Sequence, residues 1–192
     1  MDNFKTGLNL ITGKFDSGID GVFENIKNRY KEESFVTTNH EMLLKCISEN
    51  KIKFIFASNI FGDLHPGLHR ELAKKINKDA KDSNIIIIAT CYSPTAISVI
   101  EADHVFEVKN NKIYHVDNSI GLNSVEIMSF FMGIKEYPEE VDNLIKDFNY
   151  SIDDKDQKKA EKVLKKLENM INQPHICPLV SKMNIDLKLE FL

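Results

Sequence analysis

Two short and almost wholly apolar segments constrain the fold of this 192-residue chain more than any other feature. They are residues 53–57 and 84–89, and both are dominated by isoleucine, phenylalanine and alanine. Apolar runs without alternating polar positions are typical of strands that are buried on both faces, as in parallel sheets. Because neighbouring parallel strands need a crossover connection, we expect helices between the strands.

The sequence around these runs supplies the helices and a third strand. Residues 8–12 are the third candidate strand, and they open directly into a glycine-containing loop. Strands that alternate with helices predict the α/β class with a mostly parallel sheet. A hairpin is expected to follow, with strands over residues 104–108 and 113–116 around a turn at Asn110 and Asn111. Apolar residues recur at helical spacing in three sets: Val22, Phe23 and Ile26; Met42, Leu43, Cys46 and Ile47; and Leu68, Leu72, Ala73 and Ile76 after Pro66.

From about Gly121 the pattern becomes helical. Asn123 and Glu126 have the spacing of a capping box, before a helix that is expected to end near Gly133. Pro138 is expected to start another helix. Residues 151–172 carry one apolar stripe among lysines, which we interpret as a solvated helix face. We therefore expect a reduced α/β core over residues 1–120 and a helical extension over residues 121–192 that packs on this core.

The composition favours neither a membrane nor a nucleic acid as partner. The chain has 25 basic and 29 acidic side chains, so its net charge gives no reason to propose nucleic-acid binding. The N-terminal residues lack the layout of a signal peptide, and the longest apolar run, residues 85–89, is too short to cross a bilayer. Cys46, Cys91 and Cys177 lack CxxC spacing, which indicates reduced thiols. We expect a cytoplasmic protein.

The most informative segment for function is residues 7–20, which nearly forms a phosphate-binding loop. Such a loop reads GxxxxGK[ST] between a strand and a helix: its amides hold the phosphates, its lysine neutralises their oxygens, and its hydroxyl holds magnesium. Isoleucine stands at the lysine position and aspartate at the hydroxyl position, so both charge contributions are lost or reversed. The segment therefore predicts a degenerate nucleotide-binding loop made of Gly13, Lys14, Asp16, Ser17, Gly18, Ile19 and Asp20.

This opening resembles that of the ABC/SMC-type P-loop ATPases, in particular the small stand-alone ATPases of overcoming-lysogenization-type bacterial defence systems. Three further segments match that group in order. Residues 37–44 resemble the start of the signature helix, and residues 54–66 resemble the Walker B strand with its LHP turn. Residues 85–113 resemble the switch strand and the hairpin that follows it. The resemblance covers nearly the whole chain and implies a sheet of the P-loop NTPase, ABC ATPase-like type.

The departures from that family carry the functional prediction. Ser58 and Asn59 stand where the family has the magnesium-holding aspartate and the general-base glutamate, and residues 90–94 contain no switch histidine. Asn39 and His40 replace the glycine and the acid of the signature. Phosphoryl transfer depends almost entirely on positioning and charge neutralisation. The resemblance therefore implies no hydrolysis of ATP and no cofactor.

These observations predict a catalytically inactive pseudo-ATPase that acts as a protein–protein interaction module. Members of the resembled class pair around two nucleotides, so the expected partner is a second copy, as a homodimer, or an active ABC-type ATPase that the chain assists or mimics. A role in phage–host defence conflict would suit such a mimic. The candidate interaction surface comprises Thr37, Thr38, Asn39, His40, Asp63, His65 and His69.

Three alternatives remain open at this point. The first is a sensor that binds a nucleotide or phosphate without hydrolysis, with Lys14 as the substitute cation. The second is a metal-dependent enzyme rebuilt on the same scaffold, although the apolar strands lead to no carboxylate cluster. The third is zinc at Asp63, His65 and His69; because no fourth ligand is evident, we expect no metal. Cys91 is interpreted as a buried structural thiol.

Overall fold

The structure is a computed structural model that describes residues 4–14, 16–30, 34–117, 119, 121–171, 174 and 177–191. The chain divides into two compact units, Met1–Ile134 and Lys135–Leu192. The helix α5 (Ser124–Met132) therefore belongs to the first unit, whereas the sequence suggested a boundary at residue 120. Packing of the second unit on the first stays a prediction.

The first unit is built on a six-stranded sheet with the order β2-β3-β4-β1-β5-β6. All neighbouring strands are parallel except β6, which pairs antiparallel with β5. The α/β class and the mostly parallel sheet are thus confirmed. The strands are β1 (Gly7–Gly13), β2 (Ser34–Thr37), β3 (Phe54–Ser58), β4 (Ile86–Thr90), β5 (Val105–Lys109) and β6 (Lys112–His115).

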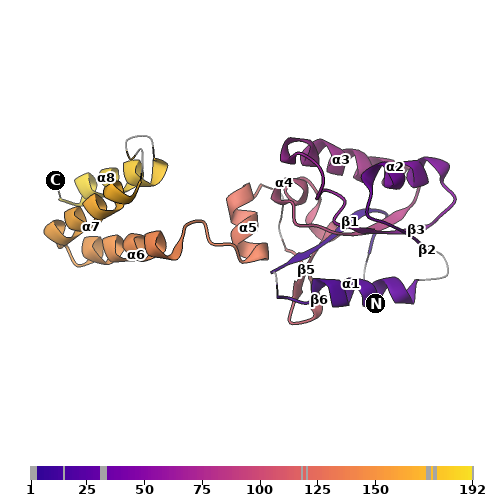
Figure 1. Cartoon of the computed structure of the whole chain (residues 1–192), viewed down its shortest axis with the longest axis horizontal. Coiled ribbons are helices and arrows are strands. Elements are labelled where there is room, and N and C mark those ends of the chain that lie inside the picture. Colours follow the sequence, from indigo (N-terminus) through magenta and orange to yellow (C-terminus); the bar gives the residue numbers. More distant parts are fainter. Residues whose placement is uncertain are drawn as a thin grey trace. The chain divides into compact units, whose positions relative to one another are not determined.

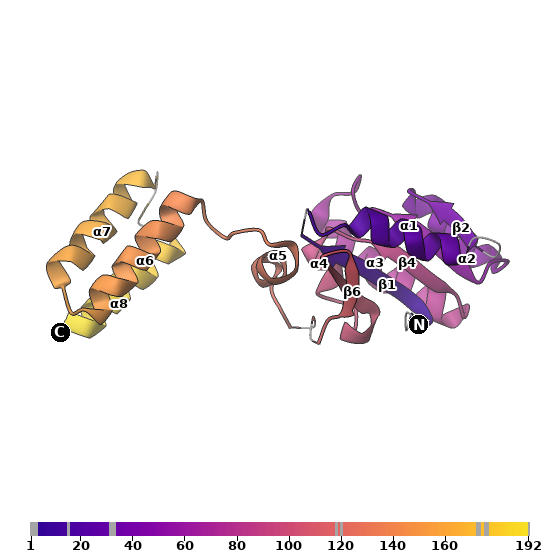
Figure 2. The ribbon, with the colours of Figure 1, turned by 90° about the horizontal axis from the view of Figure 1, so that it is seen from below.

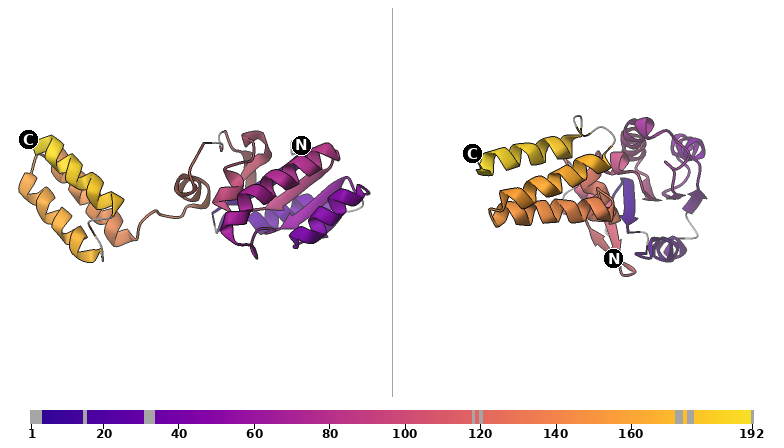
Figure 3. Two further views of the ribbon diagram at one scale, coloured as in Figure 1. Left: turned by 90° about the horizontal axis from the view of Figure 1, so that it is seen from above. Right: turned by 60° about the vertical axis from the view of Figure 1, so that its left-hand side comes forward.

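Helices cover both faces of this sheet, as Figure 1 shows. Among the described residues, α1 (Ile19–Arg29) is the one helix that covers the first face, and it is in front of the strands in Figure 2. The opposite face, seen in the left panel of Figure 3, carries α3 (Pro66–Asp82) together with α2 (His40–Glu49), α4 (Pro94–Ile97) and α5. A short 3₁₀ helix, Ala102–His104, precedes β5.

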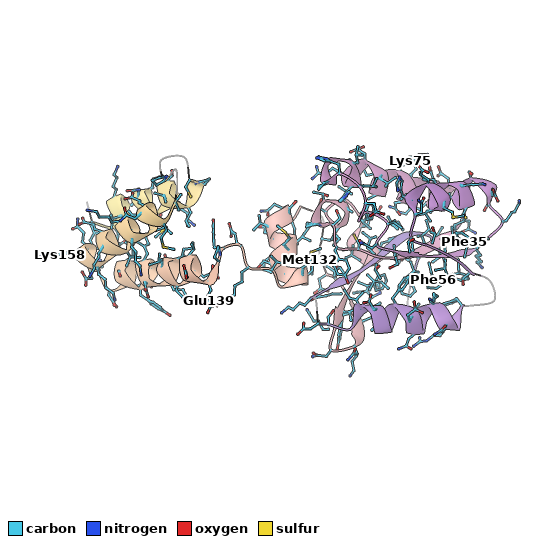
Figure 4. All side chains as sticks on the ribbon, viewed as in Figure 1. Phe35, Phe56, Lys75, Met132, Glu139 and Lys158 are labelled. Atoms are coloured by element: carbon cyan, nitrogen blue, oxygen red, sulfur yellow. The ribbon has the colours of Figure 1, made fainter. Side chains whose placement is uncertain are left out.

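Successive side chains along each strand point to opposite faces of the sheet. Phe56 lies between the sheet and α1, whereas Lys75 points away from the sheet on the outer side of α3 (Figure 4). Ile55 and Ala57, the neighbours of Phe56, belong to the core under α2 and α3. Since β3 is buried on both faces, it reads as a continuous apolar run, which is why the sequence revealed it.

The sequence interpretation of residues 37–44 as the start of a helix agrees with α2, which begins at His40. The strand β2 before it, which ends at Thr37, is not revealed by the sequence, because it has only four residues, lies at the sheet edge and leaves Val36 exposed. One expectation needs correction. The apolar stripe over residues 151–172 is not one helix. The chain turns at Lys155, which has a φ of 56°, and Asp156 caps the next helix by accepting a hydrogen bond from the Lys159 amide.

The second unit consists of α6 (Glu139–Asp153), α7 (Gln157–Met170) and α8 (Pro178–Phe191), which lie side by side in the right panel of Figure 3. Their shared core contains Leu144, Phe148, Ala160, Leu164, Leu167, Val180 and Met183. In the first unit, the predicted capping box of α5 is present, and the helix ends at Gly133. Among the described residues, no helix combines the length and the apolar character needed to span a bilayer.

Candidate functional site

The candidate site lies at the carboxyl edge of the sheet, where β1 and β4 are neighbours. The chain leaves β1 toward α1 on one face and leaves β4 toward α4 on the other. Open α/β sheets bind ligands in the crevice that such a divergence creates. The loops that follow β1, β3 and β4 therefore meet at the position where a ligand would be expected.

The loop after β1 is tightly closed. The Ser17 amide donates a hydrogen bond of 3.0 Å to the Lys14 carbonyl, and the Asn111 amide donates one of 3.0 Å to the Ser17 carbonyl. Gly18 precedes α1 with a φ of 86°, and a Cβ atom there would lie 1.9 Å from Asn111 Oδ1. The β5–β6 turn thus packs on the loop and occupies the Ser17 carbonyl, a long-range contact that the sequence did not indicate.

Ile19 occupies the position of the phosphate-binding lysine, and its side chain is part of the hydrophobic core. Its side chain is 4% exposed and belongs to the cluster between α1 and the sheet. Its Cδ1 atom would lie 3.4 Å from a Cβ atom at Gly13, so the side chain reaches back under the loop. A side chain buried in this way presents no charge to a ligand in the crevice.

Asp20 adds a negative charge at the same edge. Its side chain is exposed, and no ion pair involves it in the described part of the chain. Burial raises the pKa of the Tyr92 hydroxyl, and the negative charge of Asp20 raises it further, which places Asp20 near the loop after β4. Repulsion from this carboxylate would disfavour a triphosphate.

The side chain of Lys14 extends toward the C-terminal end of α5. The residue is exposed, and a Cβ atom at Gly133 would lie 2.9 Å from Lys14 Cδ. Asp16 is exposed, whereas Ser17 is buried. The Ser17 hydroxyl has no hydrogen-bond partner among the described residues. The loop therefore combines the Lys14 ammonium group, which extends toward α5, with a Ser17 hydroxyl that lacks a partner in the described part of the chain.

The loops after β3 and β4 are joined by hydroxyl groups rather than by carboxylates. The Asn59 amide donates a hydrogen bond of 3.0 Å to Thr90 Oγ1, which is 3.5 Å from Ser58 Oγ. Asn59 has a φ of 48° and accepts a hydrogen bond from the Gly62 amide. These contacts fix the loop geometry. Neither Ser58 nor Asn59 brings the charge needed to hold magnesium or to polarise a water molecule.

His69 and Ser93 form a contact that the sequence analysis missed. Ser93 Oγ lies 2.7 Å from His69 Nδ1, and His69 Nε2 lies 2.9 Å from the Leu64 carbonyl. Since a carbonyl only accepts, Nε2 carries a proton, and in the neutral imidazole Nδ1 therefore accepts from the Ser93 hydroxyl. Ser93 also caps α4 by accepting from the Ala96 amide. The pair Ser93-Pro94, which is typical of a helix start, was the sequence signal for this cap.

The expected interaction surface divides into exposed and buried residues. Thr38, Asn39, Asp63 and His65 are exposed at the carboxyl ends of β2 and β3, and His40 is half-buried beside them. The side chains of Thr37 and His69 are 5% and 8% exposed and point into the fold, so they are not available to a partner. In the part of the chain that the structure describes, no cluster of histidine, cysteine and acidic side chains could hold a metal ion.

No protein-family model matches this chain, and a search of the curated proteins finds no relative. The resemblance described above therefore rests on short motifs and on their order along the chain. The function must be inferred from the crevice itself.

We expect Gly18→Ala to destabilise the first unit and Gly21→Ala to stabilise it. The first substitution places a Cβ atom on Asn111 and in a left-handed conformation, at a cost of about 1–2 kcal/mol or more. Gly21 lies within α1, and a Cβ atom there would meet no other atom within 4 Å, so alanine should add about 0.5–1 kcal/mol. Urea unfolding of both variants measures the difference. Equal stabilities would contradict the tight loop.

We expect Cys91 to remain a thiol well above the pH at which ordinary cysteines ionise. Burial raises its pKa from 9.0 to about 12. The unfolded chain ionises first, so this group's contribution to stability is intact below pH 9.0 and is lost as the pH rises toward about 12. Relative to Cys91→Ala, the free energy of unfolding should fall by roughly 1.4 kcal/mol per pH unit in this window. Urea titrations of both proteins above neutral pH measure the slopes, and parallel slopes would contradict the burial of a neutral thiol.

Proposed function

We propose that this protein is a catalytically inactive pseudo-ATPase of the P-loop NTPase, ABC ATPase-like type, and that it works as a protein–protein interaction module. It pairs with a second copy or with an active ABC-type ATPase through the carboxyl edge of its sheet. The observation that carries the proposal is the burial of Ile19, since the position that should face a phosphate group is part of the core.

Three features support the loss of catalysis. The crevice keeps its place at the divergence of β1 and β4, and Asp20 adds an exposed negative charge beside the loop. Ser58 and Asn59 are tied to Thr90 and offer no carboxylate. Lys14 extends along α5. Because phosphoryl transfer needs cations and an acid–base group at defined positions, a crevice of this composition favours binding over chemistry.

The exposed residues at the same edge support an interaction role. Thr38 and Asn39 follow β2, while Asp63 and His65 follow β3. Asn39 accepts a hydrogen bond from the Met42 amide, and His65 accepts one from the Gly67 amide, so both loops are held by the helices that they start. Rigid, exposed polar loops lose little conformational entropy on binding, and this makes them suitable for contact with a partner.

One observation favours a second candidate function, a nucleotide- or phosphate-binding sensor without hydrolysis. The Ser17 hydroxyl is buried in the loop and has no hydrogen-bond partner among the described residues. An anion held by the loop could accept from it. The occupied amide of Ser17 and the negative charge of Asp20 oppose this function, so we rank it second.

We expect assembly of the full chain, alone or with an ABC-type ATPase that retains intact motifs, to be independent of magnesium-ATP. Sedimentation velocity with and without the nucleotide measures this. Asn39→Arg and Asp63→Arg should weaken the assembly roughly tenfold or more, because each places a long charged side chain on the proposed contact edge. Lys75→Glu, on the outer side of α3, is the matched control and should leave it unchanged.

A chain that stays monomeric and also fails to bind any ABC-type ATPase would contradict the interaction role. Assembly that appears only with magnesium-ATP would favour the sensor. Release of phosphate from ATP by the purified protein, absent from an Asp20→Ala variant, would show that the crevice is catalytic after all.

A further inference from the structure

The last strand of the sheet, β6, has an outer edge that no other described strand covers. It stands at the end of the strand order, and among the described strands it pairs with β5 alone (Figure 1). In an antiparallel pair, alternate residues direct their backbone N–H and C=O groups toward the neighbouring strand. The Val116 amide donates a hydrogen bond of 3.1 Å to the Val105 carbonyl, so the backbone groups of Ile113 and His115 point away from β5. A further strand is the partner that matches this alternation of donors and acceptors.

Each face of this edge carries a depression beside β6. On the α1 face, a depression of about 370 Å³ is lined by Val22 and Ile26 of α1 and by residues 111–114. On the opposite face, a depression of about 620 Å³ has Tyr114 of β6 and Phe130 of α5 among its lining residues. Side chains of an added strand alternate between the two faces and would enter both depressions. The edge is thus open to a strand on both of its faces.

The charges along the β6 edge favour a second copy of this chain as that strand. Lys112 begins β6 and Asp117 follows its end; both side chains are exposed, and no ion pair in the described part of the chain involves either of them. An edge segment that starts positive and ends negative is complementary to itself in an antiparallel arrangement. A lysine on an edge strand by itself discourages pairing, but Asp117 supplies its counter-charge. The other edge strand, β2, carries no charged residue and lacks this complementarity.

We propose that β6 pairs antiparallel with β6 of a second copy, across a two-fold axis at Tyr114. Ile113 of each copy then exchanges backbone hydrogen bonds with His115 of the other copy. Lys112 of each copy lies beside Asp117 of the other, so the contact contains two equivalent ion pairs. It uses the lateral edge of the sheet and does not rest on the function proposed for the crevice.

The same arrangement accounts for two exposed aromatic side chains. Tyr114 is 48% exposed and Phe130 is 60% exposed, and both line the depression on the α5 face. The two-fold axis places Tyr114 directly opposite Tyr114 of the second copy, at the spacing where aromatic side chains pack across strands. Because β6 has only four residues, the contact is small, and we expect a weak dimer that forms at high protein concentration.

Amide hydrogen exchange, measured by NMR on the full chain over a range of protein concentrations, tests this pairing. The amides of Ile113 and His115 should exchange roughly tenfold more slowly once most of the protein is paired. The Tyr114 amide, which faces β5, should exchange slowly at every concentration. Sedimentation velocity on the same samples gives the oligomeric state.

Charge reversal supplies the matched variants. Lys112→Glu and Asp117→Lys, both at exposed side chains, should each weaken the dimer roughly tenfold or more, because each brings like charges together twice across the axis. The double variant with both substitutions should restore the dimer, since it only inverts the ion pairs. Lys45→Glu, at an exposed residue of α2, is the matched control and should leave the dimer unchanged.

The proposal is overturned if the full chain stays monomeric up to the millimolar range, or if a dimer forms without slower exchange at Ile113 and His115. Slow exchange of these two amides in the monomer would also overturn it, because another segment of the chain would then cover the edge. So would single charge reversals that leave the dimer intact, or a double variant that fails to restore it. Asn39→Arg and Asp63→Arg should not change this exchange, so failure of the carboxyl-edge contact is a separate result.

Discussion

The packing of Ile19 under the first helix is the interaction on which the rest of the candidate site depends. The side chain joins Val22, Phe23 and Ile26 of α1 to the strands β1, β3 and β5. Full burial of an isoleucine contributes about 1.5–3 kcal/mol. A lysine at this place would have to bury its charge or leave the core, and burial of an unpaired charge costs several kcal/mol. The side chain at this position is thus part of the hydrophobic core.

The loop follows from this packing. Since Ile19 reaches back toward Gly13, the loop closes over an apolar side chain and uses its own carbonyl groups, with Asn111 of the hairpin as an additional partner. To bind a phosphate, the loop would need a concave group of backbone amides that are free to donate hydrogen bonds. The hydroxyl contacts among Ser58, Asn59 and Thr90 complete a crevice that is structurally ordered but chemically weak. This composition is the basis for the proposal that the crevice contacts another surface and does not transform a substrate.

The sequence predicted the parts of the fold that bury apolar surface on both sides. The strands around Ile55 and Ile87 were recognised because no polar residue interrupts them. The edge strand β2 was not recognised, since a short strand with Val36 exposed carries too little periodic signal. The turn at Lys155 was missed because the apolar stripes of α6 and α7 run together along the sequence.

For the site, the residue types could be predicted from the sequence, but the directions in which their side chains point could not. Gly13 and Gly18 showed the spacing of a phosphate-binding loop, yet whether Ile19 faces the crevice or the core depends on how α1 packs on the sheet. The contacts of Ser17 with Asn111, and of Ser93 with His69, join residues far apart in the sequence. The open edge of β6 likewise depends on which strand pairs with it. Long-range partners of this kind are invisible to spacing rules.

Isothermal titration calorimetry of the full chain with magnesium-ATP and with a non-hydrolysable analogue tests the central claim most directly. The buried Ile19 and the charge of Asp20 predict no saturable heat at ligand concentrations up to the millimolar range. Saturable binding that disappears in Lys14→Ala would contradict the account, because it would show that the loop still holds a phosphate group and that Lys14 supplies the missing charge.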